Sequence, residues 1–341
     1  MNNLLTSQPL AEPARTAAGF WSKRPYLKRS FLFLVILALL LSVLSQLSIQ
    51  LGRSRNPLFN ASARDLLDQP KNSVDVLVIG TSDVYSAVSP MEWWNQYGYA
   101  GFAWGEAAQR IYETHEYLKK IYRVQSPKVV FLEVGDLYRD QTDAQNLDSM
   151  AKAYIADVFP IVTYHRNLAP ERFLNLMAKP HALTKGYLLR LGTVKPSGSS
   201  DDYMKTDDSF ASFNPLSGRE LKQCIELCRS HGSSVVLLSI PSYTDWNMQK
   251  HNSVAELAEG EQVPYLDLNL ALKQQINWNT DSADGGKHLN FRGAEKVSDY
   301  LGNYLRERYA LPDHQSDTAY SAWQSDGQDY EKEMNSLRQS A

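Results

Sequence analysis

The chain has 341 residues, of which 43% are hydrophobic and 21% are charged, and its formal net charge is -3. This length and composition are typical of a globular protein that buries a substantial core in one large or two ordinary domains. The charge balance shows no basic excess of the kind that follows a phosphate backbone. We therefore expect no nucleic-acid partner.

An apolar segment without charged residues lies near the N-terminus, at residues 31–51. About 20 apolar residues suffice to cross the hydrocarbon core of a bilayer. Residues 1–30 carry five basic residues and one acidic residue, which predicts a cytoplasmic N-terminus and an exported C-terminal domain. A cleaved signal peptide is the alternative, with Val43 to Ser45 as a small-residue cleavage site. The long apolar region and the extended segment before it favour a retained anchor.

Residues 52–72 are polar, contain Pro57 and Pro70, and are interpreted as a linker. The folded domain is therefore expected over residues 73–311. Short apolar runs occur in it, and because they are apolar on both faces they predict buried parallel strands. These runs cover residues 74–79, 128–133, 234–240 and, more weakly, 263–268.

Helical patterns separate the predicted strands. They cover residues 106–122, 217–231 and 293–305. Strands that alternate with helices predict a doubly wound α/β sheet. Residues 138–214 interrupt the alternation, with helical pieces at residues 150–158 and 171–177. We interpret this stretch as an insertion that forms a lid or a substrate-binding cap.

The tail at residues 312–341 is polar and lacks sustained periodicity, which favours a mobile extension. The cysteines, Cys224 and Cys228, lie four residues apart on one face of a predicted helix. We interpret them as apolar helix-face residues rather than as a disulfide.

A serine directly after the first predicted strand is the strongest chemical signal. Ligands bind beyond the carboxyl ends of the strands in open parallel sheets, and the first apolar run stops at Gly80-Thr81-Ser82. A serine hydroxyl becomes a nucleophile when an adjacent base takes its proton. The backbone N–H groups that follow, including that of Asp83, are suited to stabilising an oxyanion. Ser82 is therefore a candidate nucleophile.

The matching candidate base is His288, which lies in the segment DGGKHLN before a predicted helix. Site residues concentrate in loops of this kind. Asp284 lies four residues upstream across two glycines, and it can fold back to accept a hydrogen bond from Nδ1 of the imidazole. Asp281 is the reserve candidate for the same role.

The segments GTSDVYS at residues 80–86 and DGGKHLNFRGA at residues 284–294 together resemble the SGNH/GDSL hydrolase superfamily, and in particular its membrane-anchored bacterial branch. The resemblance extends through GEAAQRIYETHEYLKKIY, PKVVFLEVGDLYRD, VFPIVTYHRN and IPSYTDWNMQKHN, and covers most of residues 74–305. It implies a three-layer α/β/α flavodoxin-like fold with a parallel sheet and a serine esterase or O-acyltransferase activity without a cofactor. It further implies that Ser82 is the nucleophile, His288 the base and Asp284 its orienting acid.

The chain departs from the family pattern at three places. Thr81 replaces the aspartate of the usual GDS motif, and Gly285 replaces the aspartate that usually lies three residues before the histidine. The asparagine that normally supplies an oxyanion donor after a strand is absent from the segment EVGD at residues 133–136. Gly105 and the side chain of Gln109 are candidate oxyanion donors in addition to Asp83.

Other conspicuous residues are interpreted as structural. Two of the histidines outside the motif, His165 and His251, are interpreted as structural or surface residues. The clustered tryptophans receive core roles: Trp93, Trp94 and Trp104. Carboxylates at the end of the second predicted strand lack an accompanying set of histidines: Glu133, Asp136 and Asp140. We therefore predict no metal.

The residues and the resemblance together predict a membrane-anchored enzyme that acts outside the cytoplasmic membrane on an acyl ester of a cell-envelope polysaccharide. Water as acceptor makes it an esterase and a sugar hydroxyl makes it an O-acyltransferase, and both reactions use the same residues. Anchored members of the family look like partners of membrane-bound O-acyltransferases, so the resemblance implies such a partner. The alternative is a non-catalytic envelope binding or assembly factor, which the absent asparagine and Lys287 beside His288 favour.

Overall fold

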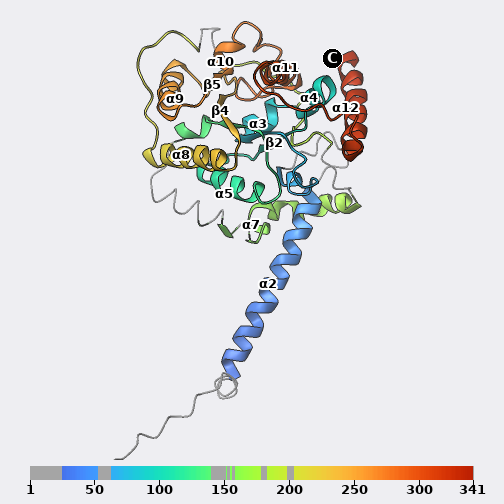
Figure 1. Ribbon diagram of the computed structural model, residues 1–341. Helices are drawn as coiled ribbons and strands as arrows, with labels where there is room; N and C mark the ends of the chain where they lie inside the picture. The colour runs from blue at the N-terminus through green and yellow to red at the C-terminus, as the bar shows by residue number, and fades with distance from the viewer. Residues whose placement is uncertain are drawn as a thin grey trace, which may run out of the picture. The chain divides into compact units, whose positions relative to one another are not determined.

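The computed structural model describes residues 25–52, 63–139, 151, 154–155, 158–177, 183–197 and 203–340. The chain divides into two units (Figure 1). The anchor unit comprises Met1–Gly52 and Ile155–Leu176, and the α/β unit comprises Arg53–Tyr154 and Met177–Ala341.

A five-stranded parallel sheet forms the centre of the α/β unit, with the order β2-β1-β3-β4-β5. The strands are β1 (Val76–Gly80), β2 (Gly101–Gly105), β3 (Val129–Glu133), β4 (Ser234–Ser239) and β5 (Tyr265–Asp267). This is the order of flavodoxin-like sheets, in which the ligand crevice lies where the winding reverses, between β1 and β3. The predicted doubly wound parallel sheet is confirmed.

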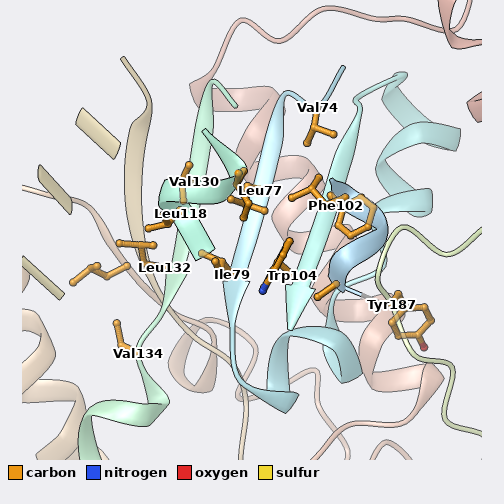
Figure 2. Packing of buried hydrophobic residues seen from close by; sticks show 14 of the residues in the cluster. Val74, Leu77, Ile79, Phe102, Trp104, Leu118, Val130, Leu132, Val134 and Tyr187 are labelled. Atoms are coloured by element: carbon orange, nitrogen blue, oxygen red, sulfur yellow. The ribbon is translucent and has the colours of Figure 1, made fainter. Parts of the chain in front are cut away.

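Both faces of the sheet are covered, which explains why its strands are largely apolar on both sides. Leu77 and Ile79 of β1 lie in one buried cluster, whereas Val76 and Val78 lie in another. Alternate residues of a strand point to opposite faces, so each cluster belongs to one face. Figure 2 shows the first cluster, with Trp104 of β2 beside Ile79.

Helices supply the outer layers (Figure 1). The cluster of Leu77 includes side chains from α5 (Ile111–Ile121), α8 (Pro215–Ser230) and α9 (Met248–Glu261). The cluster of Val76 includes side chains from α3 (Ser82–Ala87), α10 (Leu268–Ala271) and α11 (Phe291–Arg308). Helix α4 (Pro90–Tyr97) contributes to both clusters. Short 3-10 helices are η2 (Ala63–Leu66), η3 (Gly135–Tyr138) and η6 (Thr318–Tyr320).

Strand β2 was not among the predicted strands, because its sequence GFAWG contains two glycines, which lower strand propensity. The glycines are required by close neighbours. A Cβ atom on Gly101 would lie 2.5 Å from the ring of Trp93, and one on Gly105 would lie 2.8 Å from the carbonyl oxygen of Thr81. Tertiary packing therefore selects small residues at both ends of this strand.

The folded unit begins before the predicted boundary at residue 72. Ala63 and Leu66 of η2 are buried in the cluster of Leu77. The earlier part of the predicted linker, residues 53–62, lies outside the described residues.

The C-terminal tail differs from the expected mobile extension, because Ser321–Ser340 forms helix α12. Its apolar face is buried: Trp323, Tyr330 and Met334 are at most 2% exposed. The ring of Trp323 lies 5.4 Å from that of Trp94, and the hydroxyl of Tyr330 hydrogen-bonds Glu92. The helical spacing of these three residues is present in the sequence, but the many polar residues between them obscure it.

The anchor unit contains α2 (Pro25–Gly52), which is long and apolar enough to cross a membrane. Against its C-terminal turns pack α7 (Ile161–Tyr164) and η4 (His165–Leu168), and η5 (Pro170–Met177) follows. The predicted insertion is therefore divided, because residues 155–176 belong to the anchor unit, whereas residues 183–197 belong to the α/β unit. Residues 140–150 of it lie outside the described residues.

Candidate active site

Ser82 is the first residue of α3, directly beyond the carboxyl end of β1. Thr81 caps this helix, since its Oγ1 accepts the backbone N–H of Asp83 at 3.3 Å. Gly80 is needed at the turn because a Cβ atom there would overlap Cβ of Glu133. The strand end and the cap together fix the position from which the hydroxyl of Ser82 projects.

His288 reaches Ser82 from a loop 206 residues later in the chain. Its Nε2 lies 2.8 Å from Oγ of Ser82, and its Nδ1 lies 2.5 Å from Oδ2 of Asp284. The other oxygen of Asp284 accepts the backbone N–H of His288 at 2.8 Å. Serine, histidine and aspartate therefore form one continuous hydrogen-bonded relay, the arrangement in which a histidine activates a serine.

Two glycines explain how Asp284 serves His288 from four residues away. Gly285 and Gly286 have φ values of +89° and +96°, which other residues rarely adopt. They turn the chain so that both carboxylate oxygens of Asp284 face His288. Gly285 therefore takes part in the turn that brings Asp284 to His288.

Residues 183–197, the later part of the predicted insertion, form hydrogen bonds with the segment around His288. The backbone N–H of Gly285 donates to the carbonyl of Val194 at 3.0 Å, and the N–H of Phe291 donates to the carbonyl of Arg190 at 3.0 Å. Within the loop, Ala283 donates its N–H to the carbonyl of His288 at 2.9 Å. The position of His288 is therefore held by backbone contacts on both sides.

The relay is poised for proton transfer from serine to histidine. Burial lowers the pKa of His288, an effect that outweighs the raising influence of Asp284. Although burial acts in the opposite direction, the hydrogen bonds from His288 hold the pKa of Asp284 below its ordinary value. At neutral pH the imidazole is therefore neutral and able to accept a proton, and Asp284 is ionised and able to stabilise the imidazolium.

A second carboxyl group lies on the other side of the imidazole. Oδ1 of Asp83 is 3.6 Å from Nε2 of His288. Burial, together with the neighbouring carboxylates of Glu133 and Asp245, raises the pKa of Asp83 to about 8. Asp83 is therefore largely protonated at neutral pH, in contrast to Asp284.

Glu133 is the last residue of β3 and is buried. Its Oε2 accepts the backbone N–H of Thr81 at 3.0 Å, and its Oε1 accepts the N–H of Gly135. Burial outweighs these hydrogen bonds and raises the pKa of Glu133. The residue joins the end of β3 to the turn that carries Ser82, so its carboxyl group holds that turn rather than facing open solvent.

The remaining predicted site residues take different places. Asp281 hydrogen-bonds Nζ of Lys296 at 2.5 Å and the backbone N–H of Asn277 at 2.8 Å, so its carboxylate is engaged away from the imidazole. The side-chain amide of Gln109 donates to Thr114 at 2.8 Å. Of the two acids predicted for the relay, Asp284 is thus the one that the structure brings to the imidazole.

Gly105 lies beside the nucleophile turn, as β2 pairs in register with β1 and places it opposite Gly80. A Cβ atom on Gly105 would lie 2.8 Å from the backbone N of Tyr85 in α3. The backbone N–H of Asp83, another predicted oxyanion donor, is directed to Oγ1 of Thr81. Of the predicted donors, Gly105 and Asp83 lie at the end of the sheet that carries Ser82.

Sequence reasoning missed Arg190. Its Nε donates to Oγ of Ser86 in α3 at 3.0 Å, and its Nη1 lies 3.9 Å from Oδ2 of Asp284. The guanidinium therefore links the helix of the nucleophile to the acid of the relay. No motif marks this residue, because it lies inside the predicted insertion, where the sequence pattern is irregular.

A cluster of aromatic rings contacts the loop of Gly286 and His288 through Tyr243. Tyr243 donates its backbone N–H to the carbonyl of Gly286 at 2.7 Å, so it is attached directly to that loop. Its ring lies 5.3 Å from that of Tyr203 and 5.8 Å from that of Trp278. All three side chains are half-buried, so part of each aromatic side chain is exposed.

The side chains that the sequence analysis interprets as structural have contacts or burial that fit this role. His251 hydrogen-bonds Asp267 at 2.8 Å, and exposed His165 lies 3.1 Å from the carbonyl of Val162. The tryptophans are buried as expected: Trp93, Trp94 and Trp104. Cys224 and Cys228 are buried free thiols. Asp136 hydrogen-bonds Arg110, and Asp140 lies outside the described residues.

Comparisons with known proteins find similar structures but no similar sequence. No protein-family model and no curated protein sequence matches the chain. Among solved structures, a GDSL-like lipase from Bacteroides thetaiotaomicron is similar, with 11% identity, coverage of 72% of this chain and 95% of that chain, and a TM-score of 0.38. A lipase/acylhydrolase from Enterococcus faecalis is similar with 11% identity, coverage of 70% and 98%, and a TM-score of 0.40. The α/β fold assigned to this chain rests on its own five-stranded parallel sheet.

Proposed function

We propose that this protein is a membrane-anchored serine acyl-ester enzyme that acts outside the cytoplasmic membrane, by O-acyl transfer to a cell-envelope polysaccharide or by ester hydrolysis on it. The observation that carries the proposal is the hydrogen-bonded series Ser82, His288 and Asp284. Ser82 and His288 are 206 residues apart in the sequence. They meet at the carboxyl end of β1, where open α/β sheets bind ligands.

The proposed reaction begins with proton transfer. Nε2 of His288 takes the hydroxyl proton of Ser82 as Oγ attacks the ester carbonyl, and Asp284 stabilises the imidazolium that forms. The tetrahedral intermediate collapses as the imidazolium returns the proton to the leaving alcohol, which leaves the acyl group on Ser82. A second hydroxyl then repeats the sequence in reverse and carries the acyl group away.

The oxyanion of this reaction needs donors near Ser82. The backbone N–H groups of Ser82 and Gly105 lie at the required end of the sheet, and protonated Asp83 adds a neutral carboxyl group there. Glu133 does not replace the family asparagine as a donor in this proposal, because its carboxylate accepts two backbone N–H groups. Its contribution is to hold the turn that presents Ser82.

The acceptor distinguishes hydrolysis from transfer, and we favour transfer to a sugar hydroxyl. The aromatic group of Tyr203, Tyr243 and Trp278 supports a glycan, since flat aromatic faces stack on the apolar faces of sugar rings. A single anchor cannot carry an acyl group across a bilayer. Transfer therefore implies a multi-span membrane-bound O-acyltransferase as the source of the acyl group.

The membrane part of the proposal rests on α2, which is long and apolar enough to span a bilayer. The positive charges before it favour an N-terminus in the cytoplasm and an α/β unit outside. A reporter fused after Ala341 tests this topology. Activity of a periplasm-dependent reporter is expected, and activity of a cytoplasm-dependent reporter alone would contradict the proposed topology.

The reaction is tested with purified full-length protein, p-nitrophenyl acetate as donor, and chito- or cello-oligosaccharides as acceptors. We expect release of nitrophenol that Ser82→Ala abolishes, and mass spectrometry to find acetylated oligosaccharide. Free acetate alone, with the same dependence on Ser82, would identify a hydrolase. The absence of any turnover by folded protein would instead favour a non-catalytic envelope factor, the role that the missing asparagine supports.

A further inference from the structure

Described residues of the segment 155–176 are attached to one end of the anchor helix by hydrogen bonds that the proposed reaction does not use. Two of them involve the side chains of asparagines: Asn167 donates to the carbonyl of Ser48 at 3.1 Å, and Asn175 donates to the carbonyl of Leu51 at 3.3 Å. The others join Ile161 N–H to Oγ of Ser45 at 3.1 Å, and Gln50 Nε2 to the carbonyl of Leu176 at 3.1 Å.

The face of α2 that makes these hydrogen bonds is also buried. Ser45, Ser48 and Leu51 are at most 1% exposed, whereas the side chains of the same helix from Phe31 to Val43 are mostly open. A Cβ atom on Gly52 would overlap the side-chain nitrogen of Asn167. The segment therefore covers only the last turns of the anchor, where α7 lies beside α2 in Figure 1.

The length of the anchor shows where those turns lie in a bilayer. Arg29 is the last charged residue before the apolar run, and the next is Arg53. Counting about 20 residues from Arg29, enough for a hydrocarbon core of about 30 Å, places the far boundary near Gln50. Residues 45–52 extend about 10 Å along the helix at about 1.5 Å per residue. The covered turns thus straddle the boundary between acyl chains and headgroups.

The segment exposes many apolar side chains among polar ones. Its exposed side chains include six large hydrophobic ones, each at least 45% exposed: Ile155, Val158, Val162, Phe173, Leu174 and Leu176. A water-soluble surface rarely gathers so many on one short stretch. The same stretch carries exposed Glu171 and two exposed arginines, Arg166 and Arg172. The long side chains of the arginines suit the phosphates of lipid headgroups.

We propose that residues 155–176 lie in the headgroup–acyl boundary of the leaflet in which the anchor ends, with their exposed apolar side chains in contact with lipid. The proposal rests on the membrane anchor of the proposed function. Amphipathic segments bind at this depth through their buried apolar area and their cationic groups. The chain crosses between the anchor unit and the α/β unit after residues 52, 154 and 176, so three connections join the catalytic unit to membrane-bound structure.

Fluorescence quenching in liposomes tests this placement with full-length protein. A polarity-sensitive dye is attached at Phe173→Cys, and spin-labelled lipids carry the quencher near the top or near the middle of the acyl chain. Val43→Cys in the anchor is the positive control, and Phe210→Cys, an exposed position of the α/β unit, is the negative control. Wild-type protein gives the background, because its cysteines are buried.

We expect the shallow quencher to reduce the signal at residue 173 more than the deep one, and neither to affect residue 210. Quenching at residue 43 shows that the anchor is inserted, so its absence would contradict the proposed anchor itself. With residue 43 quenched, access of aqueous iodide to residue 173 without lipid quenching would overturn the inference. Protection of residue 173 from the lipid quenchers and from iodide would mean that this face contacts protein, and that result would also overturn the inference.

Discussion

The two sides of the His288 imidazole differ in how a carboxyl group is used. On the Nδ1 side, Asp284 is partly exposed, is hydrogen-bonded twice to His288 and has a lowered pKa. On the Nε2 side, Asp83 lies 3.6 Å away, and burial among other carboxylates raises its pKa to about 8. One carboxylate is therefore charged and orients the base, whereas the other is neutral beside the nucleophile.

The difference shows that environment, rather than residue type, assigns the roles of these aspartates. Pairs of titratable groups whose surroundings separate their pKa values mark acid and base functions in active sites. A negative charge at Asp83 would oppose the oxyanion that forms next to Ser82, whereas a negative charge at Asp284 stabilises the imidazolium. Replacing Asp284 by asparagine should therefore affect activity very differently from replacing Asp83 by asparagine.

Asp284→Asn should cause the largest loss of activity. It removes the charge that stabilises the imidazolium and disturbs the tautomer of His288, and we expect kcat to fall about 10⁴-fold. Steady-state hydrolysis of p-nitrophenyl acetate measures the change. The matched control is Asp281→Asn, since Asp281 pairs with Lys296 instead. An equal loss in both variants would contradict the assignment of Asp284.

Glu133→Gln tests the support beneath the nucleophile. The amide keeps one acceptor oxygen for the N–H groups of Thr81 and Gly135, so one buried donor loses its partner. Such a loss costs about 1–3 kcal/mol, and we expect kcat/KM to fall about 10- to 100-fold. Circular dichroism and thermal unfolding show whether the fold is kept. Unchanged activity would mean that Glu133 does not hold the turn.

The pH dependence of activity in the wild type and in Asp83→Asn tests the contrast between the two sides of the His288 imidazole. Activity should rise as pH increases through the pKa of His288, which burial lowers below 6.5, because only the neutral imidazole accepts the proton of Ser82. It should fall again as pH passes about 8, where Asp83 ionises. Asparagine cannot ionise, so the variant should retain activity within about tenfold and lose the alkaline decline. An alkaline decline that persists would refute the role of Asp83.

Arg190→Met should have the smallest effect. The guanidinium lies 3.9 Å from Asp284 and contributes to its lowered pKa, but the hydrogen bonds from His288 contribute more. We expect kcat/KM to fall a few-fold, about 1 kcal/mol or less for a partly exposed charge. Arg190→Lys keeps the charge and should recover part of the loss. A loss as large as that of Asp284→Asn would give Arg190 a direct role in the reaction.

Much of the sheet and the pair of Asp284 with His288 could be predicted because both are encoded locally. Buried parallel strands such as β3 and β4 are continuous apolar runs, and Ser82 follows directly after another such run, β1. The pairing of Asp284 with His288 lies within five residues of sequence. In contrast, Arg190 and Glu133 act through neighbours that only the tertiary fold supplies.

Two other features could not be predicted for different physical reasons. Strand β2 consists of small and aromatic residues selected by contacts with Trp93 and the turn after β1, not by strand propensity. Helix α12 buries only a narrow apolar face, with Trp323 against Trp94, so the polar majority of its residues hides the pattern. In both cases packing against a distant segment decides the structure.

The most direct test of the central claim is covalent labelling of the full-length protein with a fluorophosphonate, which reacts with a serine activated by an adjacent base. The account predicts a single adduct that peptide mapping assigns to Ser82, and its loss in Ser82→Ala and in His288→Gln. Folded wild-type protein that forms no adduct, or that is labelled at another residue, would contradict the assignment of Ser82 as nucleophile.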